Sequence, residues 1–142
     1  MKTTRVVLAE DNEAMRRGLR KLLTRAADIV VVGEASDGLK ALELVDSLRP
    51  EVLLLDVEMP RLTGIEVARR LKRRRKRPQI LVLSAYDDPQ YRLEMLACGA
   101  SGYLLKDDAP ARIVEAIRGL TPGEGGGSPT PATPAGPGSL EP

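Results

Sequence analysis

Short aliphatic runs alternate with segments of helical period along the first 120 residues, and this alternation constrains the fold more than any other feature of the sequence. Each run spans about four residues, is rich in Val, Ile or Leu, and lacks a polar residue at alternate positions. Such runs are typical of strands that are buried on both faces of a sheet. The five runs are residues 6–9, 29–32, 52–55, 80–83 and 103–105.

The segments that follow these runs place apolar residues at the spacing of one helical face. Asp37 and Thr63 stand where the second and third helices would begin, Gly99 follows the fourth, and Pro110 lies in the first turn of the fifth. Five strands that alternate with five helices predict an α/β fold, with helices on both faces of a parallel sheet. The apolar stripes are Met15, Leu19, Leu22, Leu23 and Ala26; Ala41, Leu42, Val45 and Leu48; Ile65, Ala68 and Leu71; the weaker stripe within 89–97; and Ile113, Ala116, Ile117 and Leu120.

The composition changes after Leu120 and divides the chain into two parts. Residues 1–120 are predicted to form one domain, whereas residues 121–142 are mostly Gly, Pro, Ser, Thr and Ala. A segment with so few apolar side chains cannot bury a core of its own. We therefore expect residues 121–142 to be a Pro/Gly-rich disordered tail or linker.

The absence of histidine limits the chemistry that this chain can perform. It excludes a Ser-His-Asp or Cys-His arrangement and the usual zinc sites, and any phosphohistidine would belong to another chain. The single cysteine, Cys98, cannot form an internal disulfide, and no apolar run approaches the ~18 residues of a membrane helix. These features predict a cytoplasmic protein without a membrane span. The net charge of +2 is too small to indicate nucleic-acid binding.

Polar side chains follow four of the five predicted strands: Glu10 and Asp11 after the first, Asp56 after the third, Ser84 after the fourth and Lys106 after the fifth. Right-handed crossovers bring the carboxyl ends of parallel strands to one edge, so these groups should converge. Crowded acids repel one another unless a cation lies among them, and oxygen ligands suit Mg²⁺. Together these groups would surround a phosphoryl group, and Asp56 on the central strand is the predicted acceptor.

Taken singly, each of these residues has a structural explanation. A lone Asp at a strand end is most often a helix cap or turn residue, a serine there is most often a loop hydroxyl, and a lysine is most often a surface cation. Their joint occurrence after the first, third, fourth and fifth strands is what favours a functional site over these explanations.

The stretches that carry these residues resemble the response-regulator receiver domain of two-component signalling. The resemblance covers about residues 4–120 and implies a flavodoxin-like, five-stranded parallel sheet in the order 2-1-3-4-5, with five helices on its two faces. The matching stretches are LAEDN at 8–12, LDVEMP at 55–60 with Gly64, LSA at 83–85 and GASGYLLK at 99–106.

The resemblance implies a role for each residue at the strand ends. Asp56 would be the phosphoacceptor, and Lys106 would contact a phosphoryl oxygen. Asp11, Asp56 and the backbone carbonyl of Glu58 would ligate Mg²⁺, with Glu10 acting largely through water.

A second pair would form the conformational switch. Ser84 would hydrogen-bond a phosphoryl oxygen once Asp56 is phosphorylated, and Tyr103 would then turn inward. A simpler explanation of Tyr103 is a half-buried aromatic residue of the strand.

The implied function is a signalling switch, with no enzyme activity beyond its own phosphorylation and dephosphorylation. The donor would be a histidine kinase or a phosphotransfer protein, and a homodimer formed on phosphorylation is left open. Residues 84–89 and the Lys106–Asp107 pair are similar to receivers that precede a LuxR-type helix-turn-helix, so a longer chain would regulate transcription. This domain itself is not expected to contact nucleic acid, because the basic run 72–77 is interpreted as a solvated helix end.

Two other classes of protein remain open at this point. An aspartate-nucleophile phosphohydrolase also places acids and a lysine around Mg²⁺, and Glu58 stands two residues after Asp56, where such enzymes keep a second acid. However, their nucleophile follows the first strand, and no cap segment is present here. A receiver-like interaction module that is never phosphorylated is the other alternative, which the full set of site residues disfavours.

Overall fold

A computed structural model describes residues 2–120, in which five strands alternate with five helices as predicted. The expected tail, residues 121–142, lies outside the described residues. The strands are β1 (Thr4–Ala9), β2 (Ile29–Ala35), β3 (Val52–Asp56), β4 (Gln79–Ser84) and β5 (Gly102–Leu105). The helices are α1 (Glu13–Arg25), α2 (Gly38–Leu48), α3 (Gly64–Lys72), α4 (Pro89–Ala97) and α5 (Ala109–Leu120).

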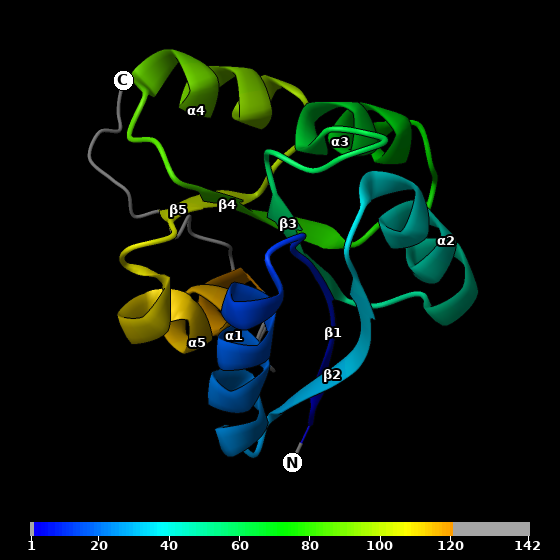
Figure 1. Ribbon diagram of the computed structural model, residues 1–142. Helices are drawn as coiled ribbons and strands as arrows, with labels where there is room; N and C mark the ends of the chain where they lie inside the picture. The colour runs from blue at the N-terminus through cyan, green and yellow to red at the C-terminus, as the bar shows by residue number, and fades with distance from the viewer. Residues whose placement is uncertain (1, 121–142) are drawn as a thin grey trace.

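All strands are parallel, and the sheet has the order β2-β1-β3-β4-β5, which confirms the predicted topology. Helices α2, α3 and α4 cover one face, and α1 and α5 cover the other (Figure 1). None of the helices in the described part of the chain is long and apolar enough to cross a membrane.

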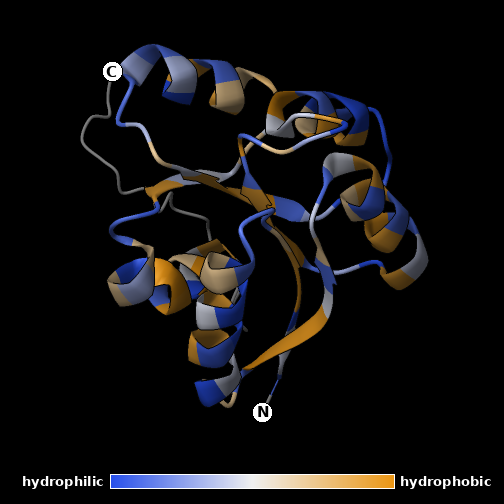
Figure 2. Cartoon of the chain, viewed as in Figure 1, coloured by the Kyte–Doolittle hydropathy of each residue, from blue (hydrophilic) through white to orange (hydrophobic). Residues whose placement is uncertain are grey.

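The core forms two aliphatic layers, one on each face of the sheet, and the apolar colour of Figure 2 is concentrated on the strands. Successive residues of β1 alternate between the layers: Val7 packs toward α2 and α3, whereas Val6 and Leu8 pack toward α1 and α5. Every residue of β3 is buried. The prediction of burial on both faces is wrong for β2, where Val30 is 42% exposed, because β2 is an edge strand.

Side-chain caps begin the helices that follow the strand ends. The predicted caps at Asp37 and Thr63 are confirmed, since their side chains accept hydrogen bonds from the backbone N–H of Lys40 and Glu66. Asn12 caps α1 in the same way. These caps fix where each chain segment turns from strand to helix, which positions the loops at the carboxyl edge of the sheet.

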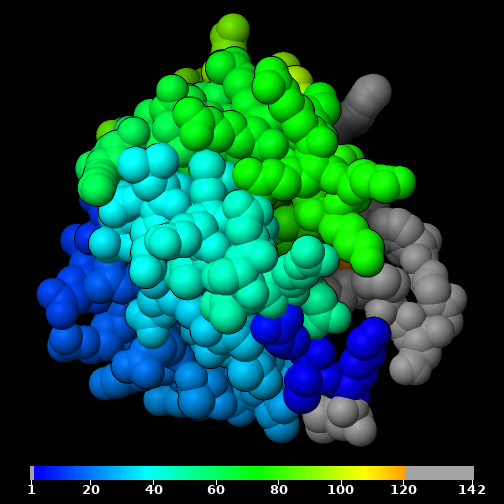
Figure 3. Space-filling model, turned by 90° about the vertical axis from the view of Figure 1, so that its right-hand side faces the viewer, coloured from blue at the N-terminus to red at the C-terminus, as the bar shows by residue number. Residues whose placement is uncertain are grey.

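The basic run 72–77 begins at the last residue of α3 and leads to the start of β4, so it lies at the amino edge of the sheet, opposite the site. In the space-filling view the green part of the chain, which includes α3, lies next to the cyan α2 (Figure 3). The cations of the basic run contact neighbouring helix ends: Lys72 Nζ donates to the carbonyl of Ala97 at 2.9 Å, and Arg77 donates to the carbonyl of Lys72 at 3.0 Å. Arg74 forms an ion pair with Asp46 of α2. Cations suit the partial negative charge of helix carboxyl ends, so this placement agrees with the interpretation as a basic helix end.

Gly64 is the first residue of α3, and its backbone passes very close to the end of β3. A Cβ atom added there would lie 2.6 Å from the carbonyl oxygen of Asp56 and 2.9 Å from Val57 Cα. We expect Gly64→Ala to lower the free energy of unfolding by roughly 1–3 kcal/mol, because backbone atoms must move apart. Gly18→Ala is the matched control, since its Cβ would meet nothing within 4 Å and its position is an exposed helix interior. The control should raise stability by roughly 0.5–1 kcal/mol in urea denaturation, and equal effects of both variants would contradict the close approach.

Candidate functional site

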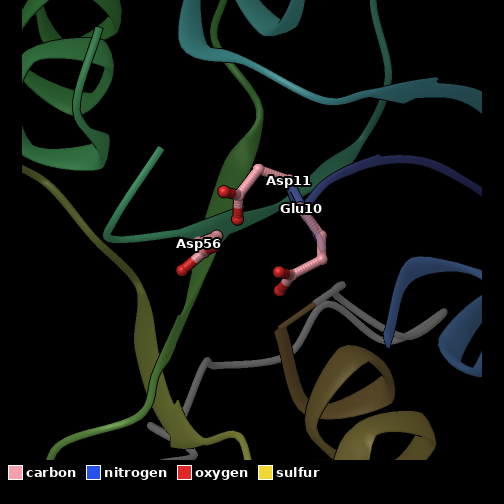
Figure 4. Close-up of side chains that lie close together, drawn as sticks. All are labelled: Glu10, Asp11 and Asp56. Carbon is pink, nitrogen blue, oxygen red and sulfur yellow. The ribbon is translucent and has the colours of Figure 1, made fainter. Parts of the chain in front are cut away.

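Three carboxylates meet at the carboxyl edge of the sheet, as the sequence predicts. Glu10 and Asp11 follow β1, Asp56 ends β3, and one carboxylate oxygen of each lies within 4.8 Å of the others (Figure 4). Glu10 is 0% exposed and Asp56 is 1% exposed, whereas Asp11 is exposed to solvent. The site therefore combines two buried acids with one acid at the surface.

Lys106 follows β5 and supplies the cation. Its Nζ lies 3.0 Å from Glu10 Oε1 and 3.1 Å from Asp56 Oδ2, and it donates a hydrogen bond of 3.1 Å to Glu10 Oε2. Burial acts to lower the pKa of Lys106, but the hydrogen bond to Glu10 and the charge of Asp56 outweigh it, so the pKa is raised. Lys106 thus remains an ammonium group that joins the ends of β1, β3 and β5.

Asp56 is held in an environment that disfavours its charge. Burial, and then repulsion by Glu10, raise the pKa of Asp56 to about 7, against the opposing attraction of Lys106. The backbone N–H of Glu58 donates to Asp56 Oδ1 at 3.2 Å, and the side chain of Glu58 is exposed. A further cation near Asp56 would favour its ionised, nucleophilic form.

The residues at this edge fit a divalent cation. Within the described residues, Glu10 Oε1 and Asp56 Oδ2 are buried without a hydrogen bond of good geometry, although Lys106 Nζ lies within 3.1 Å of both. One ammonium group does not neutralise three clustered carboxylates, and Asp11 adds an accessible oxygen to the cluster. Hard oxygen ligands of this kind suit Mg²⁺.

The pairing of Glu10 with Lys106 is a feature that the sequence reasoning missed. Besides the contact with Lys106, the Glu10 carboxylate accepts a 3.1 Å hydrogen bond from the backbone N–H of Asn12. Arg16 donates a 2.8 Å hydrogen bond to the backbone carbonyl of Glu10. The Glu10 side chain is therefore held by protein groups and anchors the lysine. The expected metal contact of Glu10 through water stays a prediction.

Ser84 and Tyr103 both contact the backbone of Tyr86, which the sequence did not single out. Ser84 Oγ donates to the carbonyl of Tyr86 at 3.2 Å and accepts from its N–H at 3.0 Å. The Tyr103 hydroxyl donates to the same carbonyl at 3.0 Å, and Tyr103 is 8% exposed, so its ring already lies inward in this structure. The side chain of Tyr86 is exposed, and no side-chain pattern could have revealed a role for its carbonyl.

Comparison with known proteins agrees with the fold and the site. The family model described as the response regulator receiver domain matches residues 6–118. The transcriptional regulatory protein YxjL of Bacillus subtilis is 39% identical over 120 residues, which cover 84% of this chain and 55% of YxjL. This chain belongs to the response regulator receiver family, whose members are the signal-receiving domains of two-component systems.

Solved structures show the same likeness. The signal receiver domain of the response regulator NarL from Mycobacterium tuberculosis superposes with a TM-score of 0.80 at 37% identity, covering 83% of this chain and 95% of that one. A LuxR-family response regulator from Aurantimonas gives a TM-score of 0.78 at 32% identity, covering 82% and 84%. The predicted likeness to receivers of LuxR-type regulators is confirmed.

The family also sets the general expectations for such a domain. Receivers of two-component systems interact with histidine kinases, and they generally bind Mg²⁺ at an acidic pocket such as the one formed by Glu10, Asp11 and Asp56. The chain spans about half the length of the curated relatives it matches, with 55%, 50% and 55% of three of them covered.

The raised pKa of Asp56 predicts a stability effect that depends on pH. A folded-state pKa near 7, above the ordinary 3.8, means that stability present at low pH is lost as pH rises through this range. Asp56→Asn should therefore be more stable than the wild type by roughly 1–3 kcal/mol at pH 8 in EDTA, and the difference should shrink toward pH 4. Urea denaturation at several pH values measures this, with exposed Asp107→Asn as the control. A difference that does not change with pH would contradict the raised pKa.

Proposed function

We propose that Asp56 accepts a phosphoryl group from the phosphohistidine of a histidine kinase or a phosphotransfer protein. The observation that carries this proposal is a buried carboxylate at the end of the central strand, with Lys106 Nζ 3.1 Å away and two further acids beside it. Such an arrangement can hold a dianionic group between cations, and phosphoryl transfer depends mainly on positioning and charge neutralisation.

In the proposed reaction, a carboxylate oxygen of Asp56 forms a bond to phosphorus as the bond between phosphorus and the donor imidazole nitrogen breaks. The bonding electrons return to that nitrogen, and the phosphoryl group stays on Asp56 as an acyl phosphate. Lys106 would stabilise the negative charge of the phosphoryl oxygens from the ammonium position that it already holds. The same groups would support slow hydrolysis by water, so the domain would catalyse only its own phosphorylation and dephosphorylation.

Asp11, Asp56 and the backbone carbonyl of Glu58 are the proposed ligands of Mg²⁺, with Glu10 contributing through water. When bound, Mg²⁺ would supply positive charge next to the transferred group. The exposed position of Asp11 leaves its carboxylate accessible to a cation from solvent, while Asp56 supplies a buried oxygen. Lys106 would then remain available to the phosphoryl oxygens.

Ser84 and Tyr103 are the residues through which phosphorylation of Asp56 would change the conformation of the domain. Ser84 lies one residue beyond Leu83, the β4 partner of Asp56, so its hydroxyl can turn from Tyr86 toward a phosphoryl oxygen. The loop from Ser84 to α4 would move with it and change the surface of α4 and β5. In a longer cytoplasmic regulator this change would control transcription through a separate output domain; whether a homodimer forms on phosphorylation is left open.

The phosphohydrolase alternative is less well supported. Glu58 would have to act as its second acid, but its side chain is exposed and its backbone N–H serves Asp56. The nucleophile also ends the third strand. The alternative of a receiver-like interaction module does not explain why two buried acids and a lysine are retained together, since such a cluster costs stability.

Incorporation of phosphate from acetyl phosphate tests the proposal. We expect the wild type to gain one acid-labile phosphoryl group only with Mg²⁺, and Asp56→Asn to gain none under the same conditions. Asp11→Asn should require at least about tenfold more Mg²⁺ for the same rate, because it removes a charged oxygen ligand. Intact-mass spectrometry and radiolabel incorporation measure both effects.

Asp46→Asn is the matched control for this experiment, because Asp46 is exposed and lies on α2, where it pairs with Arg74 away from the site. It should behave as the wild type. Equal incorporation by Asp56→Asn would refute the assignment of the acceptor. Steady turnover of p-nitrophenyl phosphate would instead favour the phosphohydrolase.

A further inference from the structure

Arg92 of α4 lies against the ring of Tyr103. Its guanidinium carbon is 5.0 Å from the ring centroid, which is within the range of a cation–π interaction. Its Nη2 also lies 3.3 Å from Asp87 Oδ1 in the loop before α4. Arg92 Nε is buried and has no hydrogen-bond partner within the described residues. The Tyr103 ring is therefore a principal contact of the buried part of the guanidinium.

Tyr103 is therefore held from two directions. Its hydroxyl donates to the carbonyl of Tyr86, and its ring face meets Arg92. The first contact ties β5 to the loop after β4, and the second ties β5 to α4. Loss of either contact would let the ring leave its buried position, because the remaining contact acts on only one end of the side chain.

The carbonyl of Tyr86 also accepts the hydroxyl of Ser84. Among the described residues, Ser84 and Tyr103 donate side-chain hydrogen bonds to this carbonyl, so Tyr103 would be the one that remains if Ser84 turns toward a phosphoryl group. A carbonyl that loses both donors in a partly buried loop is unfavourable. The release of Ser84 is thus easier when Tyr103 stays in place, and Tyr103 stays in place more often when Arg92 covers its ring.

We propose that Arg92 is a positioning residue for the switch: it holds Tyr103 against the Tyr86 carbonyl and so favours the loop conformation in which Ser84 binds the phosphoryl group. This inference rests on the proposed function of Asp56 and Ser84. Arg92 does not touch the phosphoryl group in this account and acts through Tyr103 alone. Asp87 orients the guanidinium from its exposed side, and its own contribution is smaller because the pair is open to solvent.

The first measurement follows Tyr103 itself, in Mg²⁺-free protein. The chain has three tyrosines, so ring signals in a tyrosine-labelled NMR sample can be assigned with Tyr103→Phe. Arg92→Ala should move the Tyr103 ring signals toward those of a solvent-exposed tyrosine. Arg92→Lys keeps a cation over the ring and should restore part of the shift, whereas Asp87→Asn should change little.

The second measurement is the affinity for beryllofluoride with Mg²⁺, a phosphoryl analogue that should bind at Asp56. Arg92→Ala should weaken binding roughly 2- to 30-fold, the range that the strength of one cation–π contact allows, and Arg92→Lys should recover most of it. A purely structural role would lower stability but leave this affinity unchanged, and urea denaturation of the same variants separates the two effects.

Each outcome decides the inference. Unchanged Tyr103 signals in Arg92→Ala would overturn it, and shifted signals with an unchanged beryllofluoride affinity would reduce Arg92 to a packing residue and overturn the coupling. If wild-type protein does not bind beryllofluoride, or binds it equally well as Asp56→Asn, the proposed function of Asp56 fails instead. In that case the NMR signals still show whether Arg92 holds Tyr103.

Discussion

The ion pairs of Lys106 with Glu10 and Asp56 are the interaction on which the site depends. Two buried carboxylates at neighbouring strand ends repel each other, and neither has water to stabilise its charge. Lys106 reaches them from β5, past the end of β4, and brings one ammonium group within 3.1 Å of both. Removal of Lys106 would leave two buried carboxylates without a compensating cation, so the burial of Glu10 and Asp56 depends on this one ammonium group.

The carboxylates at this edge outnumber the single ammonium group of Lys106, so the site keeps a net negative charge. One lysine cannot balance Glu10, Asp56 and the nearby Asp11, so the cluster retains an attraction for a further cation. At the same time, the complete burial of β3 keeps the acceptor in a medium where charge interactions are strong. A surface cluster with the same charges would be screened by water and would bind a small dication or a phosphoryl group less selectively.

The parts of the fold that follow from side-chain periodicity could be predicted from the sequence. The strand runs, the caps at Asp37 and Thr63, and the meeting of Asp11 with Asp56 all depend on side-chain type and spacing. The aliphatic run of β2 did not by itself indicate its exposure, because such a run has the same composition at the edge and in the centre of a sheet. The strand order implied by the family resemblance did place β2 at the edge. The sequence also could not predict that Glu10 pairs with Lys106, because the side-chain rotamer decides whether a carboxylate faces a lysine or a metal.

The backbone of Tyr86 shows a more general limit. Its carbonyl accepts hydroxyls from both Ser84 and Tyr103, yet any residue has the same carbonyl. Only the path of the loop after β4 determines that this oxygen faces two hydroxyls. Sequence patterns identify the side chains at the two ends of such a connection, and the three-dimensional structure identifies the backbone group that joins them.

The distribution of aromatic residues supports the importance of this connection. The chain has no Phe and no Trp, and its three tyrosines, Tyr86, Tyr91 and Tyr103, all lie between the end of β4 and β5. The core elsewhere is built from aliphatic side chains, so burial alone does not require an aromatic ring. Tyr103 offers what an aliphatic residue lacks: a hydroxyl that bonds a carbonyl and a ring face that attracts the guanidinium of Arg92. A single side chain therefore joins the loop after β4 to helix α4.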